Sequence, residues 1–186
     1  MRNIFITIEG VDGVGKTATV KSLAELMGAT VIQTPSIKFL NERAVLESEC
    51  IKRDKFLFYS NAIIDQQSEI DNLLNSGIVV CDRYIHSTFA YQSDDFSDKS
   101  SQINTFFEKI RRPDYSFLLT AEKKERLNRI KSREMQAGFV NDMDYRFDVI
   151  DDAEVRYLSM SDLIHVDTSG KSIDEVCSFI LKRIDL

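Results

Sequence analysis

The chain has 186 residues, of which 43% are hydrophobic and 29% are charged, and its formal net charge is −6. These values predict a single globular domain with a sizeable core, and the acidic balance argues against nucleic-acid binding, which needs a basic face. No apolar run approaches the ~18 residues of a membrane span, and the widely spaced Cys50, Cys81 and Cys177 predict free thiols in a reducing, cytoplasmic compartment.

Strand patterns alternate with helix patterns along the chain. Apolar runs predict strands at 4–8, 30–33, 78–81, 115–119 and 163–166. Helical spacing predicts helices at 18–27, 39–51, 54–75, 84–92, 100–111, 122–133 and 172–184. A further helix is predicted between residue 144 and about residue 160. Weak periodicity and a glycine at 134–144 predict a mobile loop. The alternation predicts an α/β fold: a five-stranded parallel sheet flanked by helices on both faces, with the active site at the carboxyl ends of the strands.

Residues 10–17 match the phosphate-binding loop (P-loop) pattern G-x-x-x-x-G-K-S/T without a mismatch. They lie between the first predicted strand and the first predicted helix, as this motif requires. Backbone N–H groups of such a loop turn toward phosphate oxygens, and the following helix points its positive N-terminus at the same anion. The expected nucleotide-binding residues are Gly10, Val11, Asp12, Gly13, Val14, Gly15, Lys16 and Thr17.

Asp82 and Arg83 follow a predicted buried strand at the same sheet edge as the P-loop. A carboxylate there can hold Mg²⁺ directly or through water, and the arginine can bind a second phosphoryl group, although a surface ion pair would also account for them. Asp12 is unusual because a carboxylate beside phosphate is repulsive. It either accepts a hydrogen bond from a substrate hydroxyl or belongs to a turn-favouring Asp-Gly pair. Glu9 either points into the site or is satisfied by backbone N–H groups.

The helix predicted at 122–133 is basic, and one of its faces is surrounded by Arg126, Arg129, Lys131 and Arg133. Arg129 and Arg133 are four residues apart and therefore share a face of this helix. In a phosphoryl transferase such arginines can close over the transferred group, whereas a solvated basic face would explain the same residues. The isolated His86 and His165 lack metal-ligand spacing, and we expect both to be structural.

Several segments resemble the thymidylate kinase family and occur in the family's order: 5–17, Asp82-Arg83-Tyr84 with Ser87, Ala90-Tyr91-Gln92, Pro113-Asp114, Arg129-Ile130 with Arg133, and 166–173. This resemblance implies the P-loop NTPase fold, with residues 1–186 as a single P-loop kinase domain and a short mobile lid at about 134–148. It also implies transfer of the γ-phosphoryl of ATP to the 5′-phosphate of dTMP, or a related deoxynucleotide, to give dTDP and ADP with Mg²⁺ as cofactor.

The resemblance assigns roles to single residues. The catalytic positions fall on Lys16, Asp82, Arg83, Arg129 and Arg133, and the Mg²⁺ ligands fall on Thr17 and Asp82. The P-loop binds the phosphates of ATP, and the loop containing Ser169 and Lys171 lies beside adenine. The acceptor-binding positions fall on Asp12, Phe58, Arg83, Ser87, Thr88, Tyr91 and Gln92. Asp12 then meets the ribose 3′-hydroxyl and Arg83 meets the acceptor phosphate, while Phe58 stacks on thymine and Tyr91 packs below the sugar.

Three departures from the family pattern concern the acceptor and the catalytic arginine. Ala62 stands where the family has an arginine that reads the thymine carbonyl. Residues 33–36 replace a stretch with a phosphate-binding arginine, and Lys38 is the cation expected nearby. Gly13 occupies a position where some members carry a catalytic arginine, so we expect catalysis to depend on lid arginines instead.

Other functions remain as alternatives. A deoxynucleoside kinase needs a carboxylate base after the second strand; residues 33–37 contain none, and Glu42 is the nearest candidate. A third possibility is a different small phosphorylated acceptor. A non-catalytic nucleotide-binding module would explain Ala62 and Gln33, whereas the intact Lys16 argues against it.

The expected partners are ATP and a nucleoside monophosphate, without nucleic acid or membrane. Helices at 39–75 carry many apolar positions. The resemblance implies a homodimer built there, and burial against the protein's own sheet would account for the same residues.

Overall fold

The computed structural model describes residues 3–49, 52–93, 99–138 and 145–185. Within these ranges the β-branched and aromatic runs form one sheet of strands β1 (Phe5–Glu9), β2 (Thr30–Gln33), β3 (Val79–Asp82), β4 (Tyr115–Thr120) and β5 (Ile164–Asp167). Their order is β2-β3-β1-β4-β5, and every neighbouring pair is parallel. The predicted five-stranded parallel sheet is therefore confirmed, with strand bounds shifted by about one residue.

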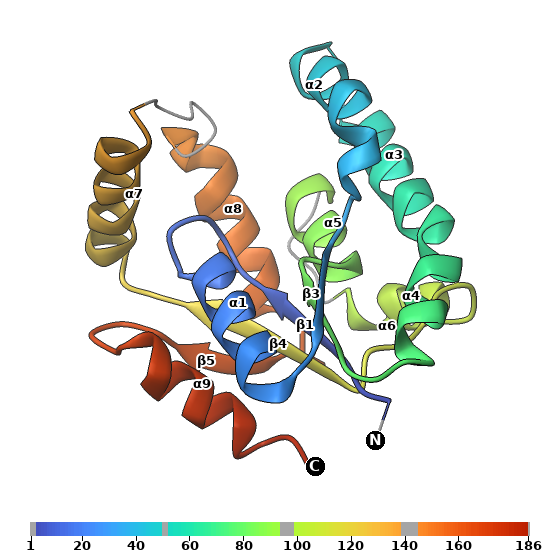
Figure 1. Ribbon diagram of the computed structural model, residues 1–186. Coiled ribbons are helices and arrows are strands. Elements are labelled where there is room, and N and C mark those ends of the chain that lie inside the picture. The colour runs from blue at the N-terminus through green and yellow to red at the C-terminus, as the bar shows by residue number, and fades with distance from the viewer. Residues whose placement is uncertain (1–2, 50–51, 94–98, 139–144, 186) are drawn as a thin grey trace.

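Helices cover both faces of this sheet (Figure 1). They are α1 (Lys16–Met27), α2 (Leu40–Glu49), α3 (Lys52–Asp65), α4 (Gln67–Leu74), α5 (Ile85–Gln92), α6 (Ser100–Phe106), α7 (Lys123–Ala137), α8 (Phe147–Leu158) and α9 (Ile173–Leu181). The short 3₁₀ helix η1 (Ile37–Phe39) precedes α2. Helices α1 and α9 pack together on one face, and α5 packs against α3 and α8 on the other.

The core lies along the central strands. All five residues of β1 are buried, as expected for a parallel strand covered on both faces. The Phe5 ring meets the Tyr84 ring edge to face, with centroids 5.2 Å apart. Ile8 of β1 and Gln33 of β2 both pair with Asp82 of β3, so these three strands end at one edge of the sheet. This register brings the P-loop beside Asp82 and the end of β2.

The helix predicted at 54–75 is two helices, because the chain bends at Gln66 between α3 and α4. Gln66 is 3% exposed, and its side-chain Nε2 donates to the Gln33 carbonyl at 3.2 Å. This tertiary hydrogen bond replaces the Gly or Pro that usually marks such a break, so the sequence carries no local signal for it.

Helix α7 extends to Ala137 and ends at Gly138 in a left-handed conformation, so the loop expected from residue 134 begins later. Residues 134–137 are good helix formers, which outweighs their weak apolar periodicity. The rest of the predicted lid consists mainly of residues 139–144, which lie outside the described residues. The helix predicted to reach residue 111 ends earlier, at Phe106.

Cys81 and Cys177 are buried free thiols, as predicted, and Cys50 lies outside the described residues. Within the described ranges, the helices are too short or too polar to cross a bilayer.

Candidate active site

The P-loop is pressed between the end of β4 and helix α7, which explains two of its glycines. Gly10 and Gly13 have φ angles of 135° and 85°, in the region that disfavours a side chain. A Cβ at Gly10 would lie 2.4 Å from the Leu119 carbonyl oxygen, and one at Gly13 would lie 2.8 Å from the Arg126 carbonyl oxygen. Any larger side chain at Gly13, such as an arginine, would therefore require α7 to move.

Lys16 begins α1 and is 7% exposed, with its Nζ donating to the Val11 carbonyl at 2.8 Å. Burial, together with the charge of Arg83, lowers the pKa of Lys16 to about 8. The Lys16 Nζ lies 3.6 Å from an Asp12 oxygen. An anion placed beside this ammonium group would favour its charged form, as a phosphate-binding lysine requires.

Thr17 and Asp82 place a hydroxyl and a carboxylate side by side at the same edge of the sheet. The Thr17 hydroxyl donates to Asp82 Oδ2 at 3.2 Å. Asp82 Oδ1 is buried and has no hydrogen-bond partner within the described ranges. Hydroxyl and carboxylate oxygens are what Mg²⁺ prefers, and a site with two protein ligands leaves room for phosphate oxygens and water. Accordingly, no group of three or more His, Cys, Asp or Glu residues suited to a metal occurs in the described part of the chain.

Arg83 adopts a left-handed φ of 67°, which is strained for a side chain of this size. The Arg83 carbonyl accepts hydrogen bonds from Thr34 Oγ1 at 2.8 Å and from Cys81 Sγ at 2.9 Å, and these contacts hold the strained backbone. Its guanidinium donates to Asp12 Oδ1 at 2.8 Å and lies 5.3 Å from the centre of the Tyr91 ring. The geometry aims Arg83 across the P-loop.

Asp12 is held ionised by this arrangement. Burial opposes its charge, but the cations of Arg83 and Lys16 outweigh burial and lower the pKa of Asp12 to about 2. The Asp-Gly turn alternative does not account for a carboxylate that pairs with an arginine from another strand end. A permanently ionised carboxylate is a good acceptor for a substrate hydroxyl.

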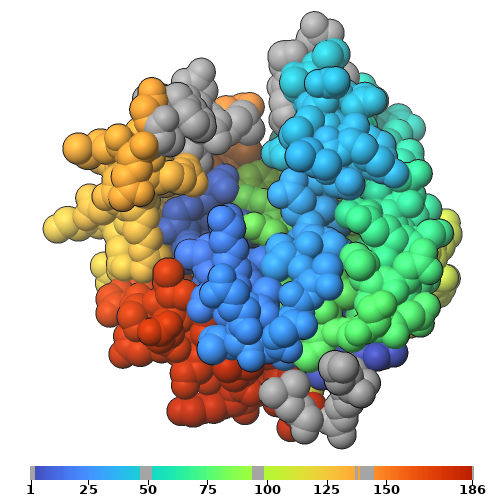
Figure 2. Space-filling model, viewed as in Figure 1, coloured from blue at the N-terminus to red at the C-terminus, as the bar shows by residue number. Residues whose placement is uncertain are grey.

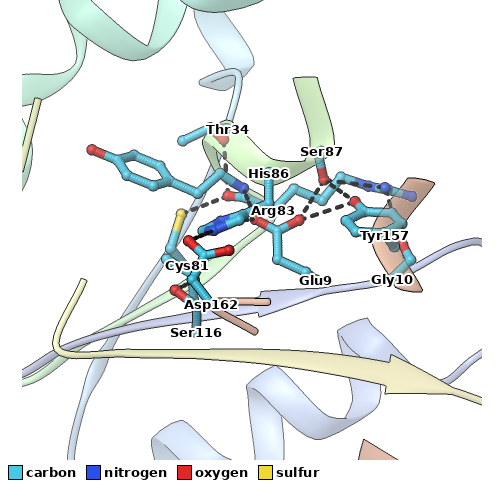
Figure 3. Close-up of polar contacts among 12 residues, drawn as sticks. Glu9, Gly10, Thr34, Cys81, Arg83, His86, Ser87, Ser116, Tyr157 and Asp162 are labelled. Atoms are coloured by element: carbon cyan, nitrogen blue, oxygen red, sulfur yellow. Dashed lines mark hydrogen bonds and ion pairs between the residues drawn. The ribbon is translucent and has the colours of Figure 1, made fainter. Parts of the chain in front are cut away.

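Glu9, the residue before the P-loop, is fully buried in a polar network beneath the site (Figure 3). It accepts hydrogen bonds from the Tyr84 amide at 2.8 Å, Ser87 Oγ at 2.6 Å and Tyr157 OH at 3.0 Å. Of the two alternatives for Glu9, satisfaction by backbone N–H groups is met only in part, because one of these donors is a backbone N–H and two are side-chain hydroxyls.

His86 links this network to the chain before β5. Its Nε2 lies 3.0 Å from Asp162 and its Nδ1 lies 3.7 Å from Glu9 (Figure 3). Burial disfavours the charged imidazole, but the hydrogen bond to Asp162 and the negative charges of Glu9 and Asp162 outweigh burial and raise the pKa of His86 to about 9. The buried position fits the structural role predicted for this histidine.

A cavity of about 1010 Å³ opens between α7 and α2 above the P-loop (Figure 2). We call the P-loop, Asp82, α7 and residues 168–173 its donor wall. The end of β2, Arg43 and Arg83 form its acceptor wall, which Asp12 faces from the P-loop. The basic residues that line the cavity are Lys16, Lys21, Arg43, Arg83, Arg129, Arg133 and Lys171, and the acidic ones are Asp12 and Asp82. A strongly positive cavity in a chain of net charge −6 fits anionic substrates.

Arg129 and Arg133 both line the cavity, as the sequence predicts. The Arg129 guanidinium donates to the Val14 carbonyl at 3.2 Å and to the Thr168 carbonyl at 2.8 Å, and it pairs with Glu125. It thus ties the P-loop to the chain after β5. Arg133 is exposed, and its charge contributes to the lowered pKa of Asp12.

Of the two residues expected beside adenine, one lines the cavity and the other does not. Lys171 lines the cavity, whereas Ser169 lies outside the lining. Ser169 Oγ accepts from the Glu122 amide at 2.9 Å and donates to Asp167 at 2.7 Å. Ser169 therefore joins the start of α7 to the loop after β5.

Of the predicted acceptor residues, Asp12 and Arg83 line the cavity, and Phe58, Ser87, Thr88, Tyr91 and Gln92 do not. Phe58 packs against Phe39 and Tyr59, with ring centroids 5.9 and 5.3 Å away. Ser87 is engaged by Glu9, and Tyr91 lies under the Arg83 guanidinium. In this structure these five side chains lie outside the cavity lining.

Sequence analysis missed Arg43, and it identified Arg126 only as one of the basic residues of the helix at 122–133. Arg43 lines the acceptor wall, whereas Lys38, the expected cation, pairs with Asp65 and lies outside the lining. Arg126 is 2% exposed, pairs with Glu154 at 2.9 Å and places its backbone against Gly13. Both arginines lie on helices, and tertiary packing decides which face of each helix points toward the cavity. In the sequence, the signal for Arg126 is the basic character of 122–133.

A P-loop facing a second cationic wall across one cavity defines a P-loop phosphotransferase, which holds a nucleoside triphosphate opposite another anionic substrate. The family model for thymidylate kinase matches residues 8–180, and the chain belongs to the thymidylate kinase family. This result confirms the resemblance and supports neither the nucleoside kinase nor the non-catalytic alternative.

Relatives match nearly the whole chain. The probable thymidylate kinase of Methanocaldococcus jannaschii is 31% identical, with 96% of this chain and 94% of the relative covered. The probable thymidylate kinase of Pyrococcus horikoshii is 30% identical, with 99% and 97% covered. The solved thymidylate kinase of Candida albicans, a protein with broad substrate specificity, matches with a TM-score of 0.72 at 22% identity over 97% of this chain and 90% of that one. This likeness confirms the fold.

Proposed function

We propose that this chain transfers the γ-phosphoryl group of ATP to the 5′-phosphate of dTMP, giving ADP and dTDP. The observation that carries the proposal is the single cavity in which the P-loop faces Arg83 and the acceptor wall. Family membership supplies the identity of the acceptor, and the names of the relatives agree with it.

The donor wall supplies charge and position. Lys16 and the P-loop amides bind the phosphates of ATP, and Arg133 neutralises charge on the transferred group. Thr17 and Asp82 would hold Mg²⁺, which neutralises phosphate charge when bound. Arg129 keeps the P-loop and the chain after β5 together, so that Lys171 flanks the donor nucleotide.

The acceptor wall orients the nucleophile. Arg83 binds the acceptor phosphate, and Asp12 accepts a hydrogen bond from the sugar 3′-hydroxyl. Phe58, Ser87, Thr88, Tyr91 and Gln92 enclose the base and sugar once the monophosphate enters. A phosphate acceptor is already ionised near neutral pH, so the reaction needs no general base. Closure of the proposed lid, at about 134–148 within a single kinase domain, excludes water.

The exposed apolar side chains of α2 and α3 support a homodimer, and the free thiols of Cys81 and Cys177 support a cytoplasmic location. Leu40, Val45 and Leu57 are 50%, 57% and 50% exposed. Packing two copies together through α2 and α3 would remove these side chains from water. Light scattering on the purified chain should give twice the mass of 21.4 kDa, and a monomer mass would refute the dimer.

The test is ADP release with ATP and Mg²⁺ over a panel of dTMP, dUMP, dCMP, dAMP, dGMP, the ribonucleotides and thymidine. We expect the highest kcat/KM with dTMP, and dTDP as the product in equal amount to ADP. Turnover of thymidine but not dTMP would move the chain to the nucleoside kinases. Absence of ADP release with every acceptor would refute the proposed transfer.

A further inference from the structure

The acceptor wall is short of positive charge for a phosphate dianion. Arg83 is bound to Asp12 at 2.8 Å, and Asp12 stays ionised because its pKa is lowered to about 2. This pair has no net charge, so it orients a phosphate better than it neutralises one. The stretch 33–36, which ends β2 and leads into η1, contains no cation.

Lys38 does not fill this gap. It pairs with Asp65, and its Nζ lies 5.1 Å from the centre of the Phe39 ring. Both members of the pair are about half exposed, and Lys38 is absent from the cavity lining. The position of Lys38 in sequence therefore does not translate into a position in the site.

Arg43 is placed where the missing charge is needed. It lies in the first turn of α2 and lines the same cavity as Arg83, Thr34 and Pro35. Its guanidinium lies 5.9 Å from the centre of the Tyr59 ring, a cation–π contact that favours this orientation without neutralising the charge. Among the described residues that line the acceptor wall, Arg43 and Arg83 are the cations.

We propose that Arg43 binds the 5′-phosphate of the acceptor and replaces the arginine that is absent from residues 33–36. The inference rests on the proposed function and deepens it by naming the residue that distinguishes a monophosphate from a nucleoside. Arginine suits this task because its planar guanidinium can donate two hydrogen bonds to one phosphate. Tyr59 then acts as the platform that keeps Arg43 turned toward the cavity.

The test compares Arg43→Ala with Lys38→Ala, a matched loss of one exposed cation from the same segment. We measure KM for dTMP and for ATP, and inhibition of dTMP turnover by thymidine as the neutral probe. Arg43→Ala should raise KM for dTMP by about 10–100-fold, leaving KM for ATP and thymidine inhibition unchanged. Lys38→Ala should leave all three constants within about twofold.

Each other outcome overturns the assignment. Equal weakening of dTMP and thymidine would place Arg43 at the base or sugar, and a rise in KM for ATP alone would place it at the donor. An unchanged Arg43→Ala variant would refute the inference while leaving the kinase proposal intact. A wild-type chain that forms no dTDP would refute the proposed function itself. Arg43→Lys keeps the charge but loses the planar guanidinium that can donate two hydrogen bonds. Its KM for dTMP should lie between those of wild type and Arg43→Ala.

Discussion

The donor wall and the acceptor wall of the cavity differ in how they are specified. The donor wall begins with eight contiguous residues, and two of their glycines, Gly10 and Gly13, are fixed by close backbone contacts with β4 and α7. The acceptor wall is assembled from the end of β2, the first turn of α2 and the residues after β3, and it uses side chains. A wall made of backbone tolerates little change, whereas a wall made of dispersed side chains can exchange one cation for another. The departure at 33–36 falls on the acceptor wall, whereas Ala62 is buried in α3 outside the cavity lining.

The buried network of Glu9, Ser87, Tyr157 and His86 joins the two walls from below. Glu9 directly precedes the P-loop, and Ser87 belongs to α5 behind Arg83. The residues that contact ligands can therefore differ on one wall without changing the other, while the same buried network supports both walls. The predictions below separate donor, acceptor and shared contributions, in order of decreasing effect.

Lys16→Ala should lower the rate of phosphoryl transfer by removing a contact of the donor wall alone. Removing a positioned cation from charge that develops during transfer costs about 10²–10³-fold in kcat. The fold should persist because Lys16 is a ligand contact, so thermal melting is the control. ADP release at saturating dTMP measures the loss, and a preserved rate would refute the assignment of the donor site.

Gly13→Ala should damage the donor wall through its backbone. The new Cβ would meet the Arg126 backbone at 2.8 Å, and φ is 85°. We expect a loss of about 2–4 kcal/mol in unfolding free energy, because strain and overpacking add. Gly28→Ala is the matched control: its φ is 61° with nothing within 4 Å, so it should lose about 1 kcal/mol. Equal losses in chemical denaturation would contradict the close packing of P-loop and α7.

His86, in the buried network beneath both walls, should make the unfolding free energy depend on pH. Its pKa is raised to about 9 in the folded chain, so its stabilisation is fully present below the unfolded pKa and is lost as pH rises through about 9. Relative to His86→Gln, the wild type should lose about 3 kcal/mol of unfolding free energy between pH 6.5 and 10. The partners facing His86 are Glu9 and Asp162.

Taking the difference from His86→Gln removes the titration of other groups, such as Lys16, from this comparison. His165→Gln, at an exposed position of β5, is the control and should keep the wild-type pH dependence. Parallel pH profiles for wild type and His86→Gln would contradict a charged His86 in the fold.

Ser172→Ala should weaken the donor side slightly. Ser172 caps α9 in a capping box with Glu175, and its Oγ accepts from the Glu175 amide at 3.3 Å. Loss of the cap should lower the unfolding free energy by about 1 kcal/mol. Ser178→Ala, exposed within the same helix, should stay within about 0.5 kcal/mol of wild type. Equal effects of the two changes would contradict the cap.

The sequence predicted what depends on local pattern and on one topological rule. The parallel strand order follows from alternating strands and helices, and it places Asp82 beside the P-loop because parallel strands end at one edge. The bend at Gln66 and the choice of Arg43 over Lys38 depend on tertiary contacts with Gln33, Asp65 and Tyr59. No residue pattern within 39–75 encodes these contacts.

The most direct test of the two-wall account is a grid of initial rates over ATP and dTMP concentrations for wild type and Arg83→Ala. Arg83 is the acceptor-wall residue closest in contact to the P-loop, through Asp12 at 2.8 Å. The account predicts that KM for dTMP rises by about 10–100-fold while KM for ATP stays within about twofold. A rise in KM for ATP with an unchanged KM for dTMP would contradict it, because the walls would then be assigned to the wrong substrates.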